Sequence, residues 1–483
     1  MHTTLDLSWK AGLHASGEGE LGNHILNPAP LSLREKVGYG LGDMASNFYQ
    51  GFFGIFLLIY YTDVFGISPA AAGTMFLVTR IVDAVTDPAM GLIADRTQTR
   101  WGKYRPYLLW MAVPYALLGY LLFLGPELGE MGKLVFAYVS YSLVMLAYTA
   151  INVPYSALLA VIHPESKERE KATQWRFIFA SLGTIIVGAV AKPLVETFGG
   201  GDDLLGYRLT MALFAVLSVV LFLFVFASTR ERIAPKREGG SVARDLSVLL
   251  RNISWIVLAL SGICIVVGLI ARISSVAYYL KYFVPSGEEA GLWWMDRTSL
   301  IITLGFVGQL FGAMLTPTFL KVFDKRGLMM FMTALNAAVL TGCYFVPAEH
   351  YWIILGFHVV SIFTFGVMIT LLFAMYTDCA EYGEWTSGVN SAGLTVSASM
   401  FSLKSGSAVG IALPAFILAG FGFVANEVQT PEAIQGIRLM FNIVPAVFFA
   451  AASVLIVFYK LDGSMVARIE SELAARRAEA VGA

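Results

Sequence analysis

The chain carries little charge for its length. Of its 483 residues, 14% are Asp, Glu, Lys or Arg, whereas soluble domains carry about 25%. Hydrophobic residues make up 57%, and the formal net charge of -1 offers no positive excess for a nucleic-acid partner. These proportions indicate an integral membrane protein and argue against an ordinary soluble domain.

Cysteines and recognisable catalytic motifs are also scarce. The three cysteines, Cys264, Cys343 and Cys379, lie in apolar segments without metal-ligand or disulfide-framework spacing. The polar N-terminus has no basic start followed by an apolar run, so we predict no signal peptide. A Walker loop, a His-Glu-x-x-His motif and a nucleophile elbow are absent from the sequence. We therefore expect a protein that is not an enzyme.

Long apolar segments, by contrast, recur along the chain. A helix needs about 20 apolar residues to cross a membrane, and about twelve segments approach that length. The predicted fold is an all-α membrane protein with two six-helix bundles. We expect a cytoplasmic N-terminal segment, a bundle, a cytoplasmic middle loop, a second bundle and a cytoplasmic tail, at 1–35, 36–229, 230–251, 252–459 and 460–483.

Lysine and arginine gather in alternate loops, which predicts the orientation. They are frequent at 96–105, 167–171, 230–251 and 321–326, and sparse in the opposite loops. The positive-inside rule places the rich side and both termini in the cytoplasm of a multi-pass cell-membrane protein. The layout in two halves favours a carrier that works by alternating access and disfavours a channel.

A polar face lies inside the second apolar segment, at about 70–95. Arg80, Asp83, Thr86 and Asp87 are three or four positions apart, so they share one face of a helix. Charged groups inside a membrane span are costly and usually mark an ion or substrate path. We interpret this face as a cation-binding site. The alternative is a structural Arg–Asp pair that only ties helices together.

Seven motifs, taken together, resemble the glycoside–pentoside–hexuronide:cation symporter family of the major facilitator superfamily. The resemblance covers about 36–459, and its motifs are Tyr60-Tyr-Thr-Asp63, Arg80 to Pro88, Trp101 to Pro106, Lys167 to Glu170, Arg176 in Trp-Arg-Phe, Glu381-Tyr-Gly-Glu384 and Lys404. It implies the major facilitator fold and symport of a small sugar or glycoside with a monovalent cation. We expect a monomer in the lipid bilayer. The alternative is a carrier of this fold for a uronate or an amphiphile.

The resemblance implies which residues bind the cation. Asp83 and Asp87 match the family's coupling carboxylates, Thr86 stands where asparagine is common, and Thr149 matches a further position near the cation. Hard cations prefer oxygen ligands, and all four side chains offer oxygen. The expected coupling ion is Na+, with H+ as the alternative.

The sugar site departs from the family pattern. Asn47 and Asn152 replace family carboxylates, and Ser156 replaces a tryptophan, but amides still donate to and accept from hydroxyls. The predicted substrate-binding residues are Asn47, Tyr148, Asn152, Ser156, Arg176, Arg272 and Lys404.

Three charged or histidine side chains leave alternatives open. Arg272 is expected either to bind substrate or to pair with an acid of the first half at the outer gate, and with Lys404 it would favour an anionic cargo. Asp43 lines a cavity or joins an interhelical bond network. His358 relays protons or only packs. The basic turn that follows the second apolar segment, at 96–105, is predicted to form a conformational latch. In this latch Asp95 accepts hydrogen bonds from its neighbours Arg96, Arg100 and Lys103.

Overall fold

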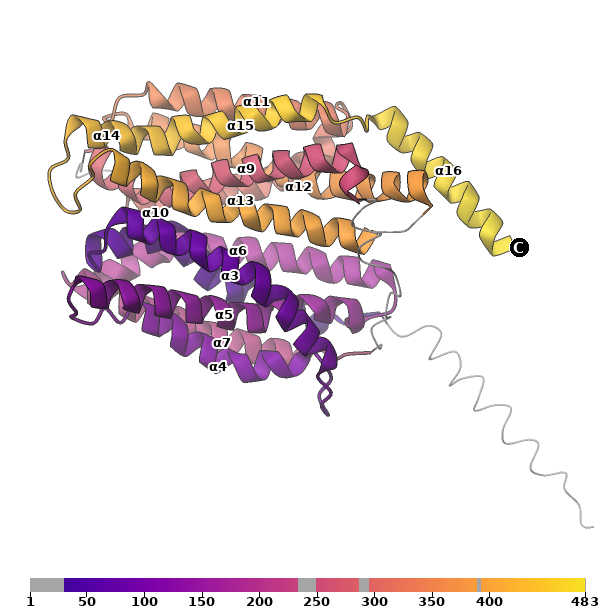
Figure 1. Cartoon of the computed structure of the whole chain (residues 1–483), viewed down its shortest axis with the longest axis horizontal. Helices are drawn as coiled ribbons and strands as arrows, with labels where there is room; N and C mark the ends of the chain where they lie inside the picture. The colour runs from indigo at the N-terminus through magenta and orange to yellow at the C-terminus, as the bar shows by residue number, and fades with distance from the viewer. Residues whose placement is uncertain (1–29, 233–248, 286–294, 389–391, 483) are drawn as a thin grey trace, which may run out of the picture.

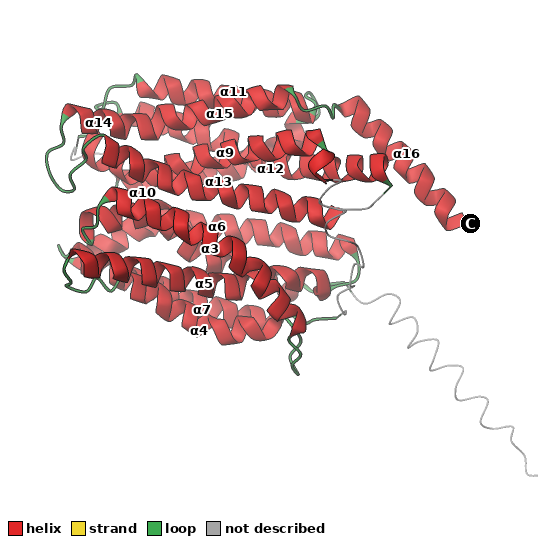
Figure 2. Ribbon diagram, in the orientation of Figure 1, coloured by secondary structure: helices red, strands yellow, loops and turns green. Residues whose placement is uncertain are grey.

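The described chain is helical throughout. The computed structural model describes residues 30–232, 249–285, 295–388 and 392–482. These ranges contain no strand, an isolated bridge pairs Thr99 with Gly102, and Figure 2 shows helices joined by loops. The expected all-α architecture is confirmed.

The first group of helices comes from the N-terminal half of the chain. α2 continues through two π-helical turns, Phe53–Leu57 and Tyr60–Val64, and so extends nearly to α3. The helices are α2 (Leu33–Phe52), α3 (Pro69–Arg96), α4 (Arg105–Leu122), α5 (Glu130–Ile162), α6 (Ser166–Gly199) and α7 (Asp203–Ser228).

The second group follows residue 249. α9 ends in a π-helical turn at Tyr279–Phe283, and a turn at Leu439–Ile443 joins α14 to α15. The helices are α9 (Ile253–Tyr278), α10 (Arg297–Phe319), α11 (Lys325–Tyr344), α12 (Tyr351–Ser387), α13 (Ala392–Gly420), α14 (Pro431–Arg438), α15 (Val444–Val457) and α16 (Gly463–Gly482).

Nine of the described helical segments are long and apolar enough to span a membrane. The long helices α2, α3 and α4 are not among them. In α3 the cause is visible, because Arg80, Asp83, Asp87 and Asp95 interrupt its apolar sequence. These three helices nevertheless pack against α5, α6 and α7 within the same group, as Figure 1 shows.

Two helix pairs hold the two groups together. The first half, indigo to magenta in Figure 1, contacts the second half mainly through α3 against α13 and through α6 against α10. At the α3–α13 crossing, a Cβ on Gly73 would lie 3.0 Å from the Ala415 side chain, so glycine permits the close approach. These two crossings, α3 with α13 and α6 with α10, therefore position the halves against each other.

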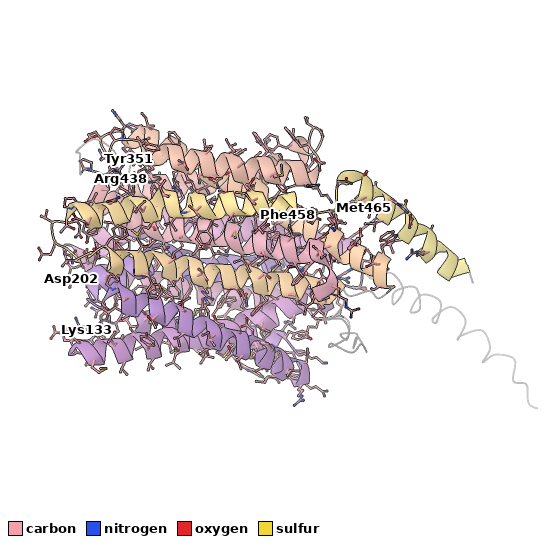
Figure 3. The ribbon with its side chains drawn as sticks, turned by 45° about the horizontal axis from the view of Figure 1, so that its top comes forward. Lys133, Asp202, Tyr351, Arg438, Phe458 and Met465 are labelled. Atoms are coloured by element: carbon pink, nitrogen blue, oxygen red, sulfur yellow. The ribbon has the colours of Figure 1, made fainter. Side chains whose placement is uncertain are left out.

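The two ends of the bundle differ in what they carry. Figure 3 places Lys133, Asp202, Tyr351 and Arg438 at one end, and Phe458 and Met465 at the other. We call these the outer and inner ends, following the orientation predicted from the basic loops. At the inner end α16 packs its apolar face on the bundle, and Trp385 Nε1 donates to Glu472 Oε2 at 2.7 Å.

Candidate cation and sugar site

The polar face of α3 turns toward the protein. Asp83 is buried, Arg80, Thr86 and Asp87 are half-buried, and the intervening Ile81 and Val85 are each 69% exposed. The apolar side chains can therefore face lipid, while the four polar side chains lie against neighbouring helices. This arrangement agrees with the helical face predicted from spacing.

Asp87 joins three helices. Its Oδ1 accepts a hydrogen bond from Thr149 Oγ1 of α5 at 2.8 Å, and its Oδ2 is paired with Lys404 Nζ of α13. Lys404 belongs to the second half of the chain, so this ion pair crosses the interface between the halves. The structure thus brings together Asp87, Thr149 and Lys404.

Asp83 lies one turn earlier on the same face of α3. Arg80 Nη1 donates to Asp83 Oδ2 at 3.1 Å, whereas Asp83 Oδ1 and Thr86 Oγ1 are buried without a hydrogen-bond partner in the described chain. Buried polar atoms are normally satisfied, so two unpartnered oxygens need an explanation. Together with the Asp87 and Thr149 oxygens, they fit the ligand preference of a hard monovalent cation.

Arg176 and Asp43 form a second charged cluster. Asp43 belongs to α2 and Arg176 to α6; Arg176 Nε and Nη2 donate to the two carboxylate oxygens. Tyr155 OH donates to Asp43 Oδ2 at 3.1 Å. Asp43 thus joins an interhelical bond network, which was one of the two alternatives left open by the sequence.

A cavity of about 690 Å³ lies between the halves, lined by α2, α6, α10, α12 and α13. Its lining, drawn from the described residues, contains no charged side chain. Its polar lining residues include Asn47, Thr184, Gln309, Thr370, Thr377 and Ser399. Asn47 was predicted from the sequence, and the other five were not.

Aromatic side chains form another part of the same lining. Phe177, Phe306, Phe373 and Tyr376 come from both halves, and Phe177 meets Phe373 edge-on with ring centroids 5.9 Å apart. Polar groups beside flat apolar surfaces suit a ligand with hydroxyls on one side and hydrocarbon on the other. Sequence spacing could not predict that Phe177 meets Phe373, because the two residues lie on different helices.

The other predicted residues of α5 lie apart from this lining. Tyr148 and Asn152 are half-buried and Ser156 is exposed, and none of the three lines the cavity. Tyr148 is close enough to both charged clusters to interact electrostatically with Asp43 and Asp87. The substrate roles of these three residues stay predictions.

Arg272 does not reach the space between the halves. It is fully buried within the second half, and its Nη1 donates to Phe441 O at 2.7 Å while its guanidinium lies 4.0 Å from the Phe441 ring centroid. The expected outer-gate pairing with an acid of the first half is therefore wrong for this conformation. His358 stacks on the same ring, which is the packing alternative.

The basic turn holds together differently from the predicted latch. Asp95 Oδ1 accepts from Tyr104 OH at 2.6 Å, Arg100 lies over the Trp101 ring, and within the described residues no ion pair joins Asp95 to Arg96, Arg100 or Lys103. The predicted bonding is wrong in this structure. A carboxylate that the sequence did not single out, Glu231, instead accepts from the backbone N–H groups of residues 103–105 at 2.7–3.0 Å.

Two ion pairs join the halves at the outer end. Lys192 of α6 pairs with Asp296 before α10, and Lys281 Nζ lies 2.5 Å from Asp63 Oδ2. Burial raises the pKa of Asp296, but Lys192 and the bonds from Ser299 outweigh that effect and bring its pKa below the ordinary value. The carboxylate is therefore charged at neutral pH. These four residues surround an outer vestibule of about 540 Å³.

Known proteins are similar in sequence to this chain over nearly its whole length. The chain is 34% identical over 446 residues to the isoprimeverose transporter of Lactiplantibacillus pentosus, which covers 90% of each chain. It is 33% identical over 456 residues to the glucuronide carrier protein homolog of Escherichia coli K12, and the match covers 92% of this chain and 96% of that protein. It is also 35% identical over 450 residues to YagG of that strain, provisionally named a glycoside/cation symporter, covering 93% and 96%.

Solved structures share the fold at low identity. A bacterial homologue of the human lysosomal transporter Spinster matches with a TM-score of 0.65 and 13% identity, over 89% of this chain and 98% of that chain. The nucleoside transporter NupG matches with a TM-score of 0.58 and 13% identity, over 89% of this chain and 99% of that chain.

The family model described as MFS/sugar transport protein matches residues 38–463. This chain belongs to that sugar-transport family of the major facilitator superfamily, and it is a secondary transporter.

Proposed function

We propose that the protein carries a neutral sugar or glycoside together with a monovalent cation, by alternating access of its two halves. The observation that carries this proposal is the uncharged polar and aromatic cavity between the halves, near an oxygen-rich charged cluster on α3. The names of the relatives, which include glycoside, isoprimeverose and glucuronide carriers, support a sugar-like cargo.

A neutral cargo is favoured over an anionic one. An anion needs an available cationic partner, yet Arg176 is engaged by Asp43 and Lys404 by Asp87. Arg272 is buried elsewhere. Hydroxyl groups, in contrast, can be bound by the amides and hydroxyls of the cavity without any charge.

The arrangement of contacts supports an inward-facing state. Ion pairs join the halves at the outer end, and the larger cavity reaches toward the inner ends of α6 and α12 through Thr173 and Thr377. To take up cargo from outside, such a carrier must first break its outer contacts and form inner ones; after the cargo binds, the outer contacts form again and the inner end opens. We propose that the protein lies in the cell membrane, with its outer end facing away from the cytoplasm and both termini inside.

The function is tested by counterflow. Purified protein in liposomes is preloaded with an unlabelled methyl glycoside and diluted into trace labelled glycoside. We expect transient uptake of the label above equilibrium, because a carrier exchanges cargo while a channel only equilibrates it. Absence of counterflow for a panel of neutral pentosides and hexosides would contradict the proposed cargo.

Asn47→Ala is expected to weaken glycoside binding. The Asn47 amide already donates to Asp43 O at 2.8 Å and accepts from Thr184 Oγ1 at 3.2 Å, which leaves one N–H and one lone pair for a sugar hydroxyl. Losing a buried polar partner costs about 1–3 kcal/mol, or roughly 5- to 150-fold in Kd. Calorimetric titration measures this change.

The matched control for Asn47 is Gln429→Ala. Its amide bonds only within its own outer loop, to the backbone around Val424 and Glu427. We expect the sugar Kd of this variant to stay unchanged. Equal Kd values for the wild type and Asn47→Ala would remove Asn47 from the sugar site.

Sodium is the proposed coupling ion. Asp83 Oδ1 and Thr86 Oγ1 are buried and unpartnered, and Asp87 with Thr149 offers further oxygens close by on α3 and α5. A proton would need only one carboxylate and would leave the threonine oxygens without a role. We expect uptake to saturate with sodium at fixed pH and to persist with an uncoupler while a sodium gradient remains. Sugar-driven alkalinisation at full rate in sodium-free medium would show proton coupling instead.

A further inference from the structure

The Arg176–Asp43 pair has the geometry with which arginine binds a substrate carboxylate. Two guanidinium nitrogens, Nε and Nη2, contact the two oxygens of one carboxylate, and Nη1 lies 3.4 Å from Tyr39 OH. Paired donation of this kind is the strongest and most selective way for arginine to bind a carboxylate. In this protein the carboxylate comes from the chain itself.

The surroundings hold this pair in place and leave it close to the cavity. The Arg176 guanidinium lies 4.8 Å from the Tyr155 ring centroid and 5.5 Å from that of Tyr39. Its helix neighbours Thr173 and Phe177 line the sugar cavity, and so does Asn47, one turn after Asp43. The two side chains remain 20% and 16% exposed, so the pair is not sealed inside the bundle.

We propose that Asp43 determines the charge selectivity of transport, because it occupies the face of Arg176 that would otherwise bind an anionic sugar. This inference rests on the proposed function, since it concerns the same cavity. With Asp43 present, a uronate must displace a bound carboxylate, whereas a neutral sugar meets a neutral ion pair. Without Asp43, Arg176 becomes a largely buried cation that lacks its partner.

The loss of Asp43 should therefore create a requirement for an anion. Removing one partner of a buried ion pair is strongly destabilising, because the remaining charge is left uncompensated. A sugar carboxylate that reaches Arg176 would restore the missing bonds. Asp43→Asn keeps the size of the side chain and removes only its charge, so it isolates this effect.

The experiment compares two probes that differ only at C6, methyl β-D-glucoside and methyl β-D-glucuronide. Their Kd values and their effects on the unfolding temperature are measured with the wild type and with Asp43→Asn. We expect the ratio of glucuronide to glucoside affinity to rise at least about tenfold in Asp43→Asn, which corresponds to 1.4 kcal/mol. Asp43→Glu, which keeps the carboxylate, is the control and should keep the wild-type ratio.

A double variant separates Arg176 from other effects. In Asp43→Asn combined with Arg176→Gln, the gain for glucuronide should disappear, because no cation is left to bind it. An unstable Asp43→Asn protein that glucuronide protects from unfolding better than glucoside does also supports the proposal. Equal protection by both sugars, or a glucuronide gain that persists in the double variant, would overturn it.

The outcome is distinct from a failure of the proposed function. If counterflow detects no neutral glycoside, the proposed cargo is wrong, yet selective protection of Asp43→Asn by glucuronide would still assign Arg176 as the site for a carboxylate. If counterflow succeeds and the affinity ratio does not change, the proposed function stands and Asp43 is not the selectivity residue.

Discussion

Asp87→Asn is expected to abolish cation-driven accumulation of sugar and to leave downhill exchange in place. The Asp87 carboxylate accepts from Thr149 and pairs with Lys404 across the two halves. An amide keeps the size of the side chain but has no charge with which to hold a cation. Without cation binding, a gradient of that cation cannot drive the sugar uphill, although the sugar cavity does not include Asp87.

The variant should remain folded in the membrane. Lys404 would lose its partner, but its side chain is 48% exposed, so the long flexible side chain can turn its ammonium group toward a polar region. Uphill uptake is measured in vesicles with an imposed cation gradient, and exchange is measured by counterflow in the same vesicles. Unchanged uphill uptake by Asp87→Asn would exclude Asp87 from the coupling site.

Asp202→Asn provides the control for this experiment. It makes the same chemical change at the outer N-cap of α7, where Asp202 Oδ1 accepts from Leu205 N at 3.1 Å. Asparagine caps a helix about as well as aspartate does. Uptake by this variant should therefore match the wild type, and a similar loss would point to a general effect of removing an acidic group.

The sequence predicts the polar face of α3 well because a single helix determines it. Residues three and four apart must share a face, and a charged face in a membrane span must turn toward protein or water. Those two rules were enough to group Arg80, Asp83, Thr86 and Asp87. Hydropathy alone, by contrast, does not identify α3 as a membrane span, because its charged residues make it too polar.

Spacing along the chain does not by itself predict which side chains pair between helices. Asp43 and Arg176 are 133 positions apart, and Asp87 and Lys404 are 317 apart. Which side chains meet depends on the rotation and tilt of each helix. Arg272 shows the limit most clearly, because α9 is buried on nearly all sides, so apolar periodicity gives no direction for its one arginine. The ion pairs of Lys192 and Lys281 at the outer end were not predicted, for a similar reason.

The outer end is closed by contacts that cross from one half to the other. Asp63 accepts from Lys281 and from Tyr282 OH, and Asn426 Nδ2 donates to Asp63 O at 2.7 Å. On the other side of the vestibule, Lys192 pairs with Asp296. All of these bonds must break for the outer end to open, so they stabilise the outer-closed state relative to the outer-open state.

Lys192→Met combined with Lys281→Met should shift the protein toward the outer-open state. The two lysine side chains are 36% and 40% exposed, so each pair contributes a modest amount, about 0.2–1 kcal/mol by the measured range for exposed pairs. Losing both favours opening by up to about 2 kcal/mol, or roughly 30-fold in the equilibrium. Spin labels at Thr197 and Glu349, both exposed and near the outer end of each half, report the opening as a longer distance.

Lys133→Met removes a lysine from the same end without touching the interface between the halves. Lys133 Nζ donates to Phe65 O at 2.9 Å and lies over the Phe65 ring, so its contacts stay within the first half. We expect its distance distribution to match the wild type. If the double variant also matches, the two ion pairs do not set the balance between the states. If Lys133→Met opens the outer end as far as the double variant does, loss of positive charge explains the shift, because the outer vestibule also contains the carboxylates Glu196 and Asp203.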